Sequence, residues 1–249
     1  MVEVLSGWTK DSFTAAGFTR DTYRRGSGPG VIVVHEIPGI TPKVAEFAND
    51  VVAAGFTVMM PSLFGSPGKE PGGVYLAQSM AKVCISREFT HWALDQTSPI
   101  ISWLRALARS LHQECGGPGV GAIGMCFSGG FALGMMVDEV MVAPVLSQPS
   151  MPFAVGKGRR GADLNLSPDD ALAVAQRASE GCQVLGLRFT GDKLVGTRFD
   201  SLRALLGDAF IAVDLPSASP KDHSVLTEQR DEPSVRRVLD FLSAKLLPA

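Results

Sequence analysis

The stretch that decides the fold is Val120-Gly121-Ala122-Ile123-Gly124-Met125-Cys126-Phe127-Ser128-Gly129-Gly130. An apolar run leads into a cysteine that has small residues on both sides, because Gly124 stands two positions before Cys126 and Ser128 two positions after it. Small residues there permit a very tight turn from a strand into a helix. Such a turn exposes the thiol at the sheet edge, and the helix N-terminus favours the attacking thiolate. The stretch predicts a nucleophile elbow.

A second interpretation of Cys126 is open at this point, because free cysteines are often small, buried core residues. The usual elbow has glycine where this chain has Ser128. The choice between a packing role and a chemical role for Cys126 therefore depends on residues elsewhere in the chain.

Apolar runs bounded by Gly, Pro or polar residues recur on both sides of this stretch. Continuous apolar runs are typical of strands that are covered on both faces. Besides Val120–Met125, the runs predict strands over Val31–Val34, Phe56–Met60, Val140–Val145, Val184–Phe189 and Ala209–Leu215. Helical spacing of apolar residues predicts helices over Pro42–Ala54 and Ser98–Leu111 and from Pro233 to Leu246. The alternation predicts an α/β fold with a mostly parallel sheet and helices on both faces.

The organisation of the chain favours one domain over residues 1–249, since no internal repeat or low-complexity tract divides it. The first 29 residues are less regular. Within them, Phe18–Tyr23 is predicted to form an edge strand or part of a hairpin.

Composition excludes several classes of protein. Of 249 residues, 45% are hydrophobic and 19% are charged, which argues against disorder, and a net charge of −2 gives no sign of nucleic-acid binding. No run approaches the ~18 apolar residues of a membrane span, and the N-terminus lacks a signal-peptide pattern. The four cysteines form no CxxC pair, which argues against a zinc site and a disulfide framework. We expect a cytoplasmic protein with reduced thiols and no metal or cofactor.

Two residues follow later predicted strands in the order that an α/β-hydrolase sheet requires, which is nucleophile, acid and then histidine. Asp192 lies just past the strand over Val184–Phe189, and His223 follows the strand over Ala209–Leu215. Loops at the carboxyl ends of strands gather the sites of such sheets. We therefore expect an α/β-hydrolase fold in which Cys126, Asp192 and His223 form a triad.

Other interpretations of these residues stay open from the sequence alone. Asp192 stands beside a glycine and could be a turn residue, and His223 could be an ordinary loop histidine. Asp222 is a second, weaker candidate for the acid, because a neighbour in the chain cannot easily direct its carboxylate at the ring of His223. The coincidence of three placements favours the functional interpretation.

The loop His35-Glu36-Ile37-Pro38-Gly39 follows the first buried strand, where this architecture places a donor to the oxyanion. The backbone N–H groups of Ile37 and Phe127 are predicted to hold the oxyanion, and one such donor is worth about 3 to 4 kcal/mol. His35 is expected to hold the loop rather than react.

From about Val31 to the C-terminus, these residues resemble the dienelactone hydrolase family of the α/β-hydrolase fold. The resemblance rests on His35–Gly39, on Gly124–Gly130 and on Gly191-Asp192 with Asp222-His223-Ser224. A cysteine in the elbow is uncommon among α/β-hydrolases and is the most specific sign. The resemblance implies the same triad, and it also gives Glu36 a role, since the matching glutamate of the family contacts the resting thiol and helps to deprotonate it.

The sequence departs from the family where the substrate is bound. Dienelactone hydrolases bind the substrate carboxylate with arginines, one of them shortly after the catalytic histidine. Here Ser224-Val225-Leu226-Thr227 follows His223, and the next arginine is Arg230. Arg87 is the candidate for another substrate contact. We expect a small ester or lactone as substrate and do not assign dienelactone itself.

The sequence thus predicts a hydrolase that forms a thioester with a small-molecule substrate, with no nucleic-acid or membrane partner. Two alternatives keep the fold. In one, Cys126 senses oxidants, because an exposed thiolate is readily oxidised. In the other, the chain is a binding protein without catalysis. The oligomeric state is not indicated by the sequence.

Overall fold

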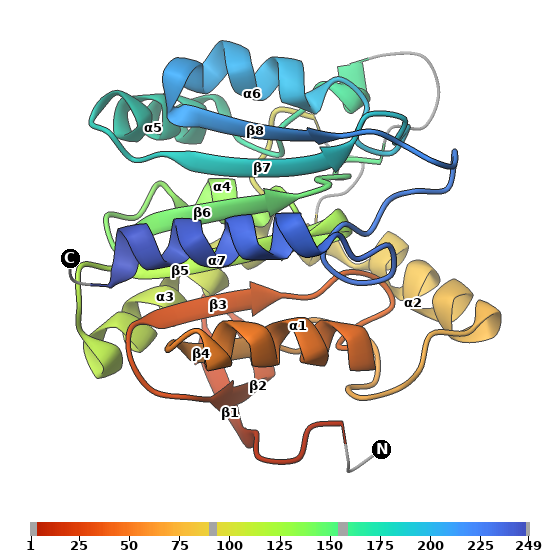
Figure 1. Ribbon diagram of the computed structural model, residues 1–249, viewed down its shortest axis with the longest axis vertical. Helices are drawn as coiled ribbons and strands as arrows, with labels where there is room; N and C mark the ends of the chain where they lie inside the picture. Colours follow the sequence, from red (N-terminus) through yellow and green to blue (C-terminus); the bar gives the residue numbers. More distant parts are fainter. Residues whose placement is uncertain (1–3, 90–93, 154–158, 248–249) are drawn as a thin grey trace.

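The computed structural model describes residues 4–89, 94–153 and 159–247. Its centre is an eight-stranded sheet with the order β1-β2-β4-β3-β5-β6-β7-β8 (Figure 1). The β1–β2 and β2–β4 pairs are antiparallel, and all other pairs are parallel. The strands are β1 Thr9–Ala15, β2 Phe18–Arg25, β3 Gly30–Val34, β4 Thr57–Pro61, β5 Val120–Met125, β6 Met141–Ser147, β7 Val184–Phe189 and β8 Phe210–Leu215.

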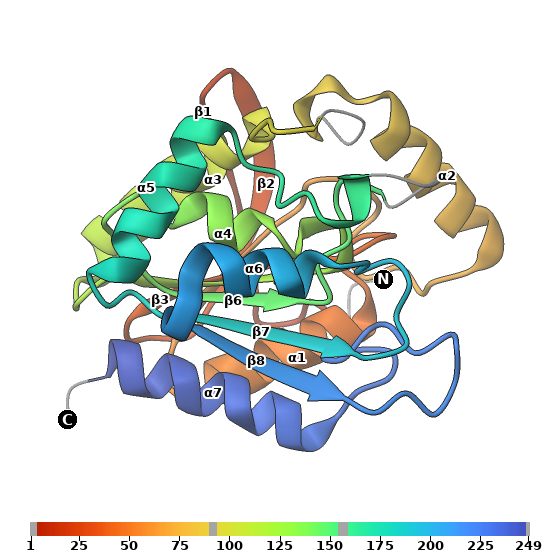
Figure 2. The same cartoon turned by 90° about the horizontal axis from the view of Figure 1, so that it is seen from above.

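Helices cover both faces of this sheet (Figure 2). On one face lie α1 (Pro42–Ala53) and α7 (Glu232–Leu246), and on the other lie α3 (Pro99–Cys115), α4 (Phe131–Met135), α5 (Pro168–Ser179) and α6 (Arg198–Leu206). Helix α2 (Gly73–Ile85) lies beyond the carboxyl ends of the parallel strands in both views. Four short 3₁₀ turns complete the described elements: η1 Arg87–Phe89, η2 Cys126–Ser128, η3 Arg159–Gly161 and η4 Gly207–Ala209.

Two apolar clusters, one on each face, hold the layers together. Buried side chains of α3, α4, α5 and α6 pack on one face, and those of α1 and α7 pack on the other. Both β3 and β5 are buried along their whole length, which fits their unbroken apolar sequences. Local signals start the helices, since Thr41 accepts a hydrogen bond from the amide of Val44 before α1, and Asp231 accepts one from Ser234 before α7.

The sequence predicted most of this arrangement. The mostly parallel sheet, helices on both faces and the N-terminal hairpin are confirmed. One predicted strand, Val140–Val145, is shifted, because β6 runs on to Ser147. Strand β1 and helices α2, α5 and α6 were not predicted. Among the described residues, no helix is long and apolar enough to cross a membrane.

Candidate active site

Cys126 stands at the tight turn between β5 and α4, with a left-handed backbone φ of 51°. This conformation is uncommon for a residue with a side chain and occurs at strained functional turns. The chain closes on itself here, because a Cβ atom at Gly124 would lie 2.2 Å from the carbonyl oxygen of Ser128. One at Gly129 would lie 2.5 Å from the Cα atom of Pro149. The structure has the strand-turn-helix geometry of an elbow.

Gly124→Ala is therefore expected to lower the free energy of unfolding by about 1 to 3 kcal/mol, the usual cost of overpacking. The added methyl group meets backbone atoms rather than a flexible side chain, so relief requires the elbow to move. Urea unfolding measures the change. Gly73→Ala is the matched control, since nothing lies within 4 Å of the added Cβ atom there. Equal stability of the two variants would contradict the close packing of the elbow.

Ser128 joins the elbow to the loop that follows β3. Its buried hydroxyl lies 2.9 Å from the carbonyl oxygen of Val34 and 3.1 Å from that of His35, and it accepts a hydrogen bond from the amide of Met125. Serine in place of the usual glycine thus links two loops across adjacent parallel strands.

The predicted acid and histidine lie together beside the elbow. His223 Nδ1 is 2.6 Å from Asp192 Oδ2, and the Asp192 side chain is only 3% exposed. Burial lowers the pKa of His223, but the charges of Cys126 and Asp192 and the hydrogen bond to Asp192 raise it by more, to about 11. The imidazole thus contacts the carboxylate, and it lies near enough to the thiol for the charge of Cys126 to affect its pKa.

Asp222, the weaker acid candidate, has a different role. Its carboxylate accepts hydrogen bonds from the backbone amides of Ala218 and Ser219, at 2.7 and 2.8 Å. These bonds close the loop before His223. Asp192, not Asp222, is the carboxylate that meets the imidazole ring.

Glu36 is almost fully buried, and neutral donors surround its carboxylate. Thr227 donates to Oε1, while Ser224 and Gln148 donate to Oε2 at 2.8 and 3.3 Å. Burial raises the pKa of Glu36, and the hydrogen bonds from Thr227 and Ser224 oppose this only in part. In the part of the chain that the structure describes, no hydrogen bond joins Glu36 to Cys126. In this conformation the Glu36 carboxylate is bound to the loop that carries His223.

Sequence reasoning missed the three partners of Glu36. Gln148 follows β6 directly, and a polar residue at the carboxyl end of a parallel strand was a usable signal. Ser224 and Thr227 stand one and four positions after His223, so the loop that presents the imidazole also holds the carboxylate. No local pattern distinguishes these two hydroxyls from those of a solvated loop.

Glu36→Gln is expected to be more stable than the wild type, by a margin that grows with pH. The folded protein keeps the Glu36 proton to a higher pH than the unfolded chain, where the pKa is near 4.5. Stability therefore falls as pH rises from about 4.5 through the folded-state pKa, and the neutral amide removes this loss. Urea unfolding at several pH values measures the difference, with exposed Glu70→Gln as control. A difference that shrinks as pH rises would contradict burial of the charge.

His35 ties the loop after β3 to its neighbours through both ring nitrogens. Its Nε2 accepts a hydrogen bond from the amide of Leu63 at 3.0 Å, so Nδ1 carries the proton and donates to the carbonyl of Glu36 at 2.9 Å. Burial lowers the pKa of His35 to about 4. The ring is therefore a neutral structural element at physiological pH.

The two residues predicted to supply oxyanion donors occupy equivalent positions past paired strands. Val34 of β3 lies opposite Gly124 of β5, and Ile37 and Phe127 each follow three residues later. The loops are bonded through Ser128, as described above. This register brings Ile37 and Phe127 to the same edge of the sheet, next to Cys126 and Glu36.

The structure places one of the two arginines considered for substrate binding, Arg230, and does not describe the side chain of the other, Arg87. Arg230 bonds Glu232 and Asp50, so its guanidinium is engaged between α1 and α7, away from the elbow. The side chain of Arg87 lies outside the part of the chain that the structure describes. Substrate binding by Arg87 is still a prediction.

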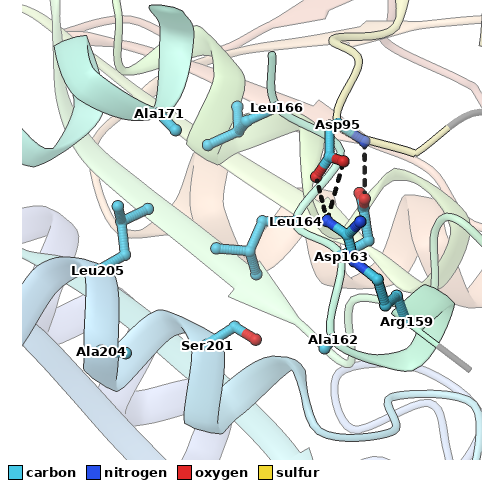
Figure 3. A pocket seen from close by; sticks show the side chains of 10 residues that line it. All are labelled: Asp95, Arg159, Ala162, Asp163, Leu164, Leu166, Ala171, Ser201, Ala204 and Leu205. Carbon is cyan, nitrogen blue, oxygen red and sulfur yellow. Dashed lines mark hydrogen bonds and ion pairs between the residues drawn. The ribbon is translucent and has the colours of Figure 1, made fainter. Parts of the chain in front are cut away.

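A cavity of about 470 Å³ lies between α5, α6 and the segment before α5 (Figure 3). Its lining is mainly Leu and Ala side chains, and Arg159 bonds Asp95 at its rim. None of the predicted site residues lines it. Among the described residues, no group of three His, Cys, Asp or Glu side chains is placed to hold a metal ion.

Comparison with known proteins gives one family and a consistent set of folds. The sequence profile of the dienelactone hydrolase family matches residues 16–148, more than half of the chain. The match includes Glu36, Ile37, Cys126 and Phe127. No curated protein matches the chain.

Solved structures similar to this chain include a dienelactone hydrolase assigned in Klebsiella pneumoniae subsp. pneumoniae, with a TM-score of 0.65, 20% identity and coverage of 96% of this chain and 97% of that one. A promiscuous phosphotriesterase from metagenomic libraries, described as dienelactone hydrolase-like, has a TM-score of 0.64, 16% identity and coverage of 96% and 98%. A cold-adapted esterase from an Arctic intertidal metagenomic library has a TM-score of 0.62, 16% identity and coverage of 95% and 93%. At these identities the likeness concerns the fold, and the predicted α/β-hydrolase fold is confirmed.

Proposed function

Since the chain belongs to the dienelactone hydrolase family and is a hydrolase of esters or lactones, we propose that it acts through Cys126, His223 and Asp192 on a small ester or lactone. The observation that carries the proposal is the 2.6 Å contact between His223 and Asp192 beside the strained Cys126 turn. A base that is oriented by a carboxylate and adjacent to a nucleophile is the arrangement that acyl transfer requires.

In the proposed first half-reaction, Cys126 Sγ attacks the ester carbonyl as a thiolate. A carbon–sulfur bond forms, and the amides of Ile37 and Phe127 hold the oxyanion of the tetrahedral intermediate. When the intermediate collapses, the carbon–oxygen bond to the alcohol breaks, and His223 gives its proton to the departing alkoxide. The acyl group is left on Cys126 as a thioester.

In the second half-reaction, neutral His223 removes a proton from a water molecule, whose oxygen attacks the thioester. Collapse of the second intermediate releases the carboxylic acid and returns the thiolate of Cys126. Asp192 keeps the imidazole in the orientation in which Nδ1 faces the carboxylate and Nε2 faces the reacting atoms. For a lactone, the alcohol and acid are parts of one product.

Glu36 is proposed to accept the thiol proton of Cys126 before the first step, as in the family. Burial favours a carboxyl group that takes up a proton, because it disfavours the charged form. The carboxylate must leave Thr227 or Ser224 to reach the thiol. Both hydroxyls lie on the His223 loop, and Gln148, which follows β6, is the third donor to the same carboxylate.

Intact-mass measurement during reaction with a panel of aryl esters and lactones tests the proposal. The expected result is a transient mass increase equal to the acyl group, located on the peptide that contains Cys126, together with release of the alcohol. Hydrolysis without any acyl adduct on this peptide would contradict the nucleophile assignment. No turnover across the panel, with loss of the Cys126 thiol under peroxide, would favour the oxidant-sensing alternative.

A further inference from the structure

Arg198, the first residue of α6, is a buried cation that the proposed reaction does not use. It is 1% exposed, although it is one of the largest side chains in the protein. Its guanidinium donates to six backbone carbonyls: those of Met151, Pro152, Arg160, Asp163, Leu194 and Val195. In the described part of the chain, no carboxylate forms an ion pair with it.

These acceptors belong to three separate segments. Met151 and Pro152 follow β6, Arg160 and Asp163 belong to the segment before α5, and Leu194 and Val195 belong to the loop after β7. Burial lowers the pKa of Arg198 to about 10, so the side chain is still charged at physiological pH. One guanidinium therefore supplies donors to a converging set of backbone carbonyls from three segments.

One branch of this network leads to the acid of the triad. Arg198 Nη1 donates to the carbonyl of Leu194 at 2.9 Å, and the amide of Leu194 donates to Asp192 Oδ1, also at 2.9 Å. The other oxygen of Asp192 meets His223. A single residue, Leu194, thus connects the guanidinium to the carboxylate that orients the imidazole.

A second branch leads to the nucleophile. Arg198 Nε donates to the carbonyl of Met151 at 3.1 Å. The preceding residue, Ser150, donates its amide to the carbonyl of Cys126 at 3.0 Å. The same guanidinium therefore supports both the elbow and the acid loop, which come from different parts of the sequence.

We propose that Arg198 is a positioning residue that sets the place of Asp192, and through it His223, relative to Cys126. The proposal rests on the function proposed above. Arginine suits this task because its planar fork carries five N–H donors, whereas a lysine ammonium has three and cannot bridge the same acceptors. Its positive charge also attracts the nearby Asp192 carboxylate.

Arg198→Lys and Arg198→Gln test the proposal, since each keeps some donors while losing the fork. We expect kcat for a hydrolysed ester to fall about 10- to 100-fold with little change in KM, the effect of a misplaced catalytic group. The rate is expressed per folded molecule, measured by circular dichroism. Unchanged kcat in a folded variant would overturn the proposal.

Arg159→Gln is the matched control. Arg159 lies on the segment before α5 that supplies two of the carbonyls bound by Arg198, and it bonds Asp95 at the rim of the cavity in Figure 3, but it is exposed and does not contact the acid loop. We expect its kcat to equal that of the wild type. An equal loss in Arg159→Gln and Arg198→Lys would show a general effect of the segment and would also overturn the proposal.

The proton on His223 Nδ1 gives a readout that does not depend on turnover. A proton shared between imidazole and carboxylate gives a low-field nuclear magnetic resonance signal, and Asp192→Asn identifies it by its loss. We expect the signal to be lost or broadened in a folded Arg198 variant and unchanged in Arg159→Gln. If the wild type hydrolyses nothing, the proposed function fails, while this signal still decides the positioning role.

If neither Arg198 variant folds, the wild type in mild urea provides the test. We expect the His223 signal to be lost at the urea concentration at which the Arg198 Nε proton begins to exchange rapidly with solvent. Persistence of the His223 signal after this exchange has become fast would overturn the proposal.

Discussion

Cys126→Ala is expected to reduce kcat/KM for ester hydrolysis by about four orders of magnitude or more, the usual effect of removing the nucleophile of a triad. Without the sulfur, no thioester forms, and the oxyanion donors alone give only weak catalysis. Alanine keeps the Cβ atom at the position where φ is 51°, so the strain of the elbow is unchanged. Hydrolysis of a chromogenic aryl ester measures the loss.

Cys182→Ala is the matched control for this experiment. Cys182 is also a partly buried free thiol, but it contacts the carbonyl of Met141 and lies far from the elbow in the fold. We expect its rate to stay within about twofold of the wild type, since the change touches no group of the site. A Cys126→Ala protein with more than about a tenth of the wild-type activity would refute the nucleophile assignment.

Asp192→Asn is expected to reduce kcat by about 10⁴-fold, with the fold retained. The carboxylate accepts the Nδ1 proton of His223, whereas an amide can present its NH₂ group to the ring and favour the wrong tautomer. Asp222→Asn is the control, because this carboxylate is adjacent to His223 in the chain and bonds only loop amides. If Asp222→Asn lost as much activity as Asp192→Asn, the choice of acid would be wrong.

The same pair of variants differs in the pH dependence of stability. The pKa of His223 is raised to about 11 in the folded protein, so its contribution is fully present below the unfolded value of 6.5 and is lost as pH rises toward 11. Asp192→Asn removes one cause of the raised pKa. We expect this variant to lose less stability than Asp222→Asn between about pH 6 and about pH 10, measured by urea unfolding.

The sequence predicted β3 and β5 because their unbroken apolar runs are buried on both faces, and it predicted β8 because its residues are mostly apolar although only partly buried. Strand β1 was missed because its first four residues are exposed and polar. Helix α2 was missed because it buries only a narrow stripe of residues. Among its described residues the buried ones are Tyr75, Ser79 and Val83, and these do not produce a helical repeat of apolar residues in the sequence. In α5 two residues are buried, Val174 and Ala178. Apolar periodicity predicts a helix only when a broad face of that helix is buried.

The residues of the candidate site also differ in how far the sequence could predict them. Asp192 and His223 could be predicted because the order of strands in an α/β sheet fixes which loops meet. Glu36 required the family resemblance, and its hydroxyl partners required coordinates. Arg198 had no signal in the sequence, because its burial at the start of α6 is explained by carbonyls that come mostly from segments distant in the chain.

The parallel pairing of β3, β5, β6 and β7 has a consequence for biosynthesis. The ribosome releases Cys126 roughly 100 residues before His223, a delay of roughly 5 to 20 s at about 5 to 20 residues per second. During that interval β3 has already been synthesised and can pair with β5, but His223 and the two hydroxyl partners of Glu36, Ser224 and Thr227, have not yet been synthesised. A nascent chain of this kind carries the proposed nucleophile without its proposed base, so on the proposed mechanism hydrolysis begins only when the last loop and α7 close over the sheet.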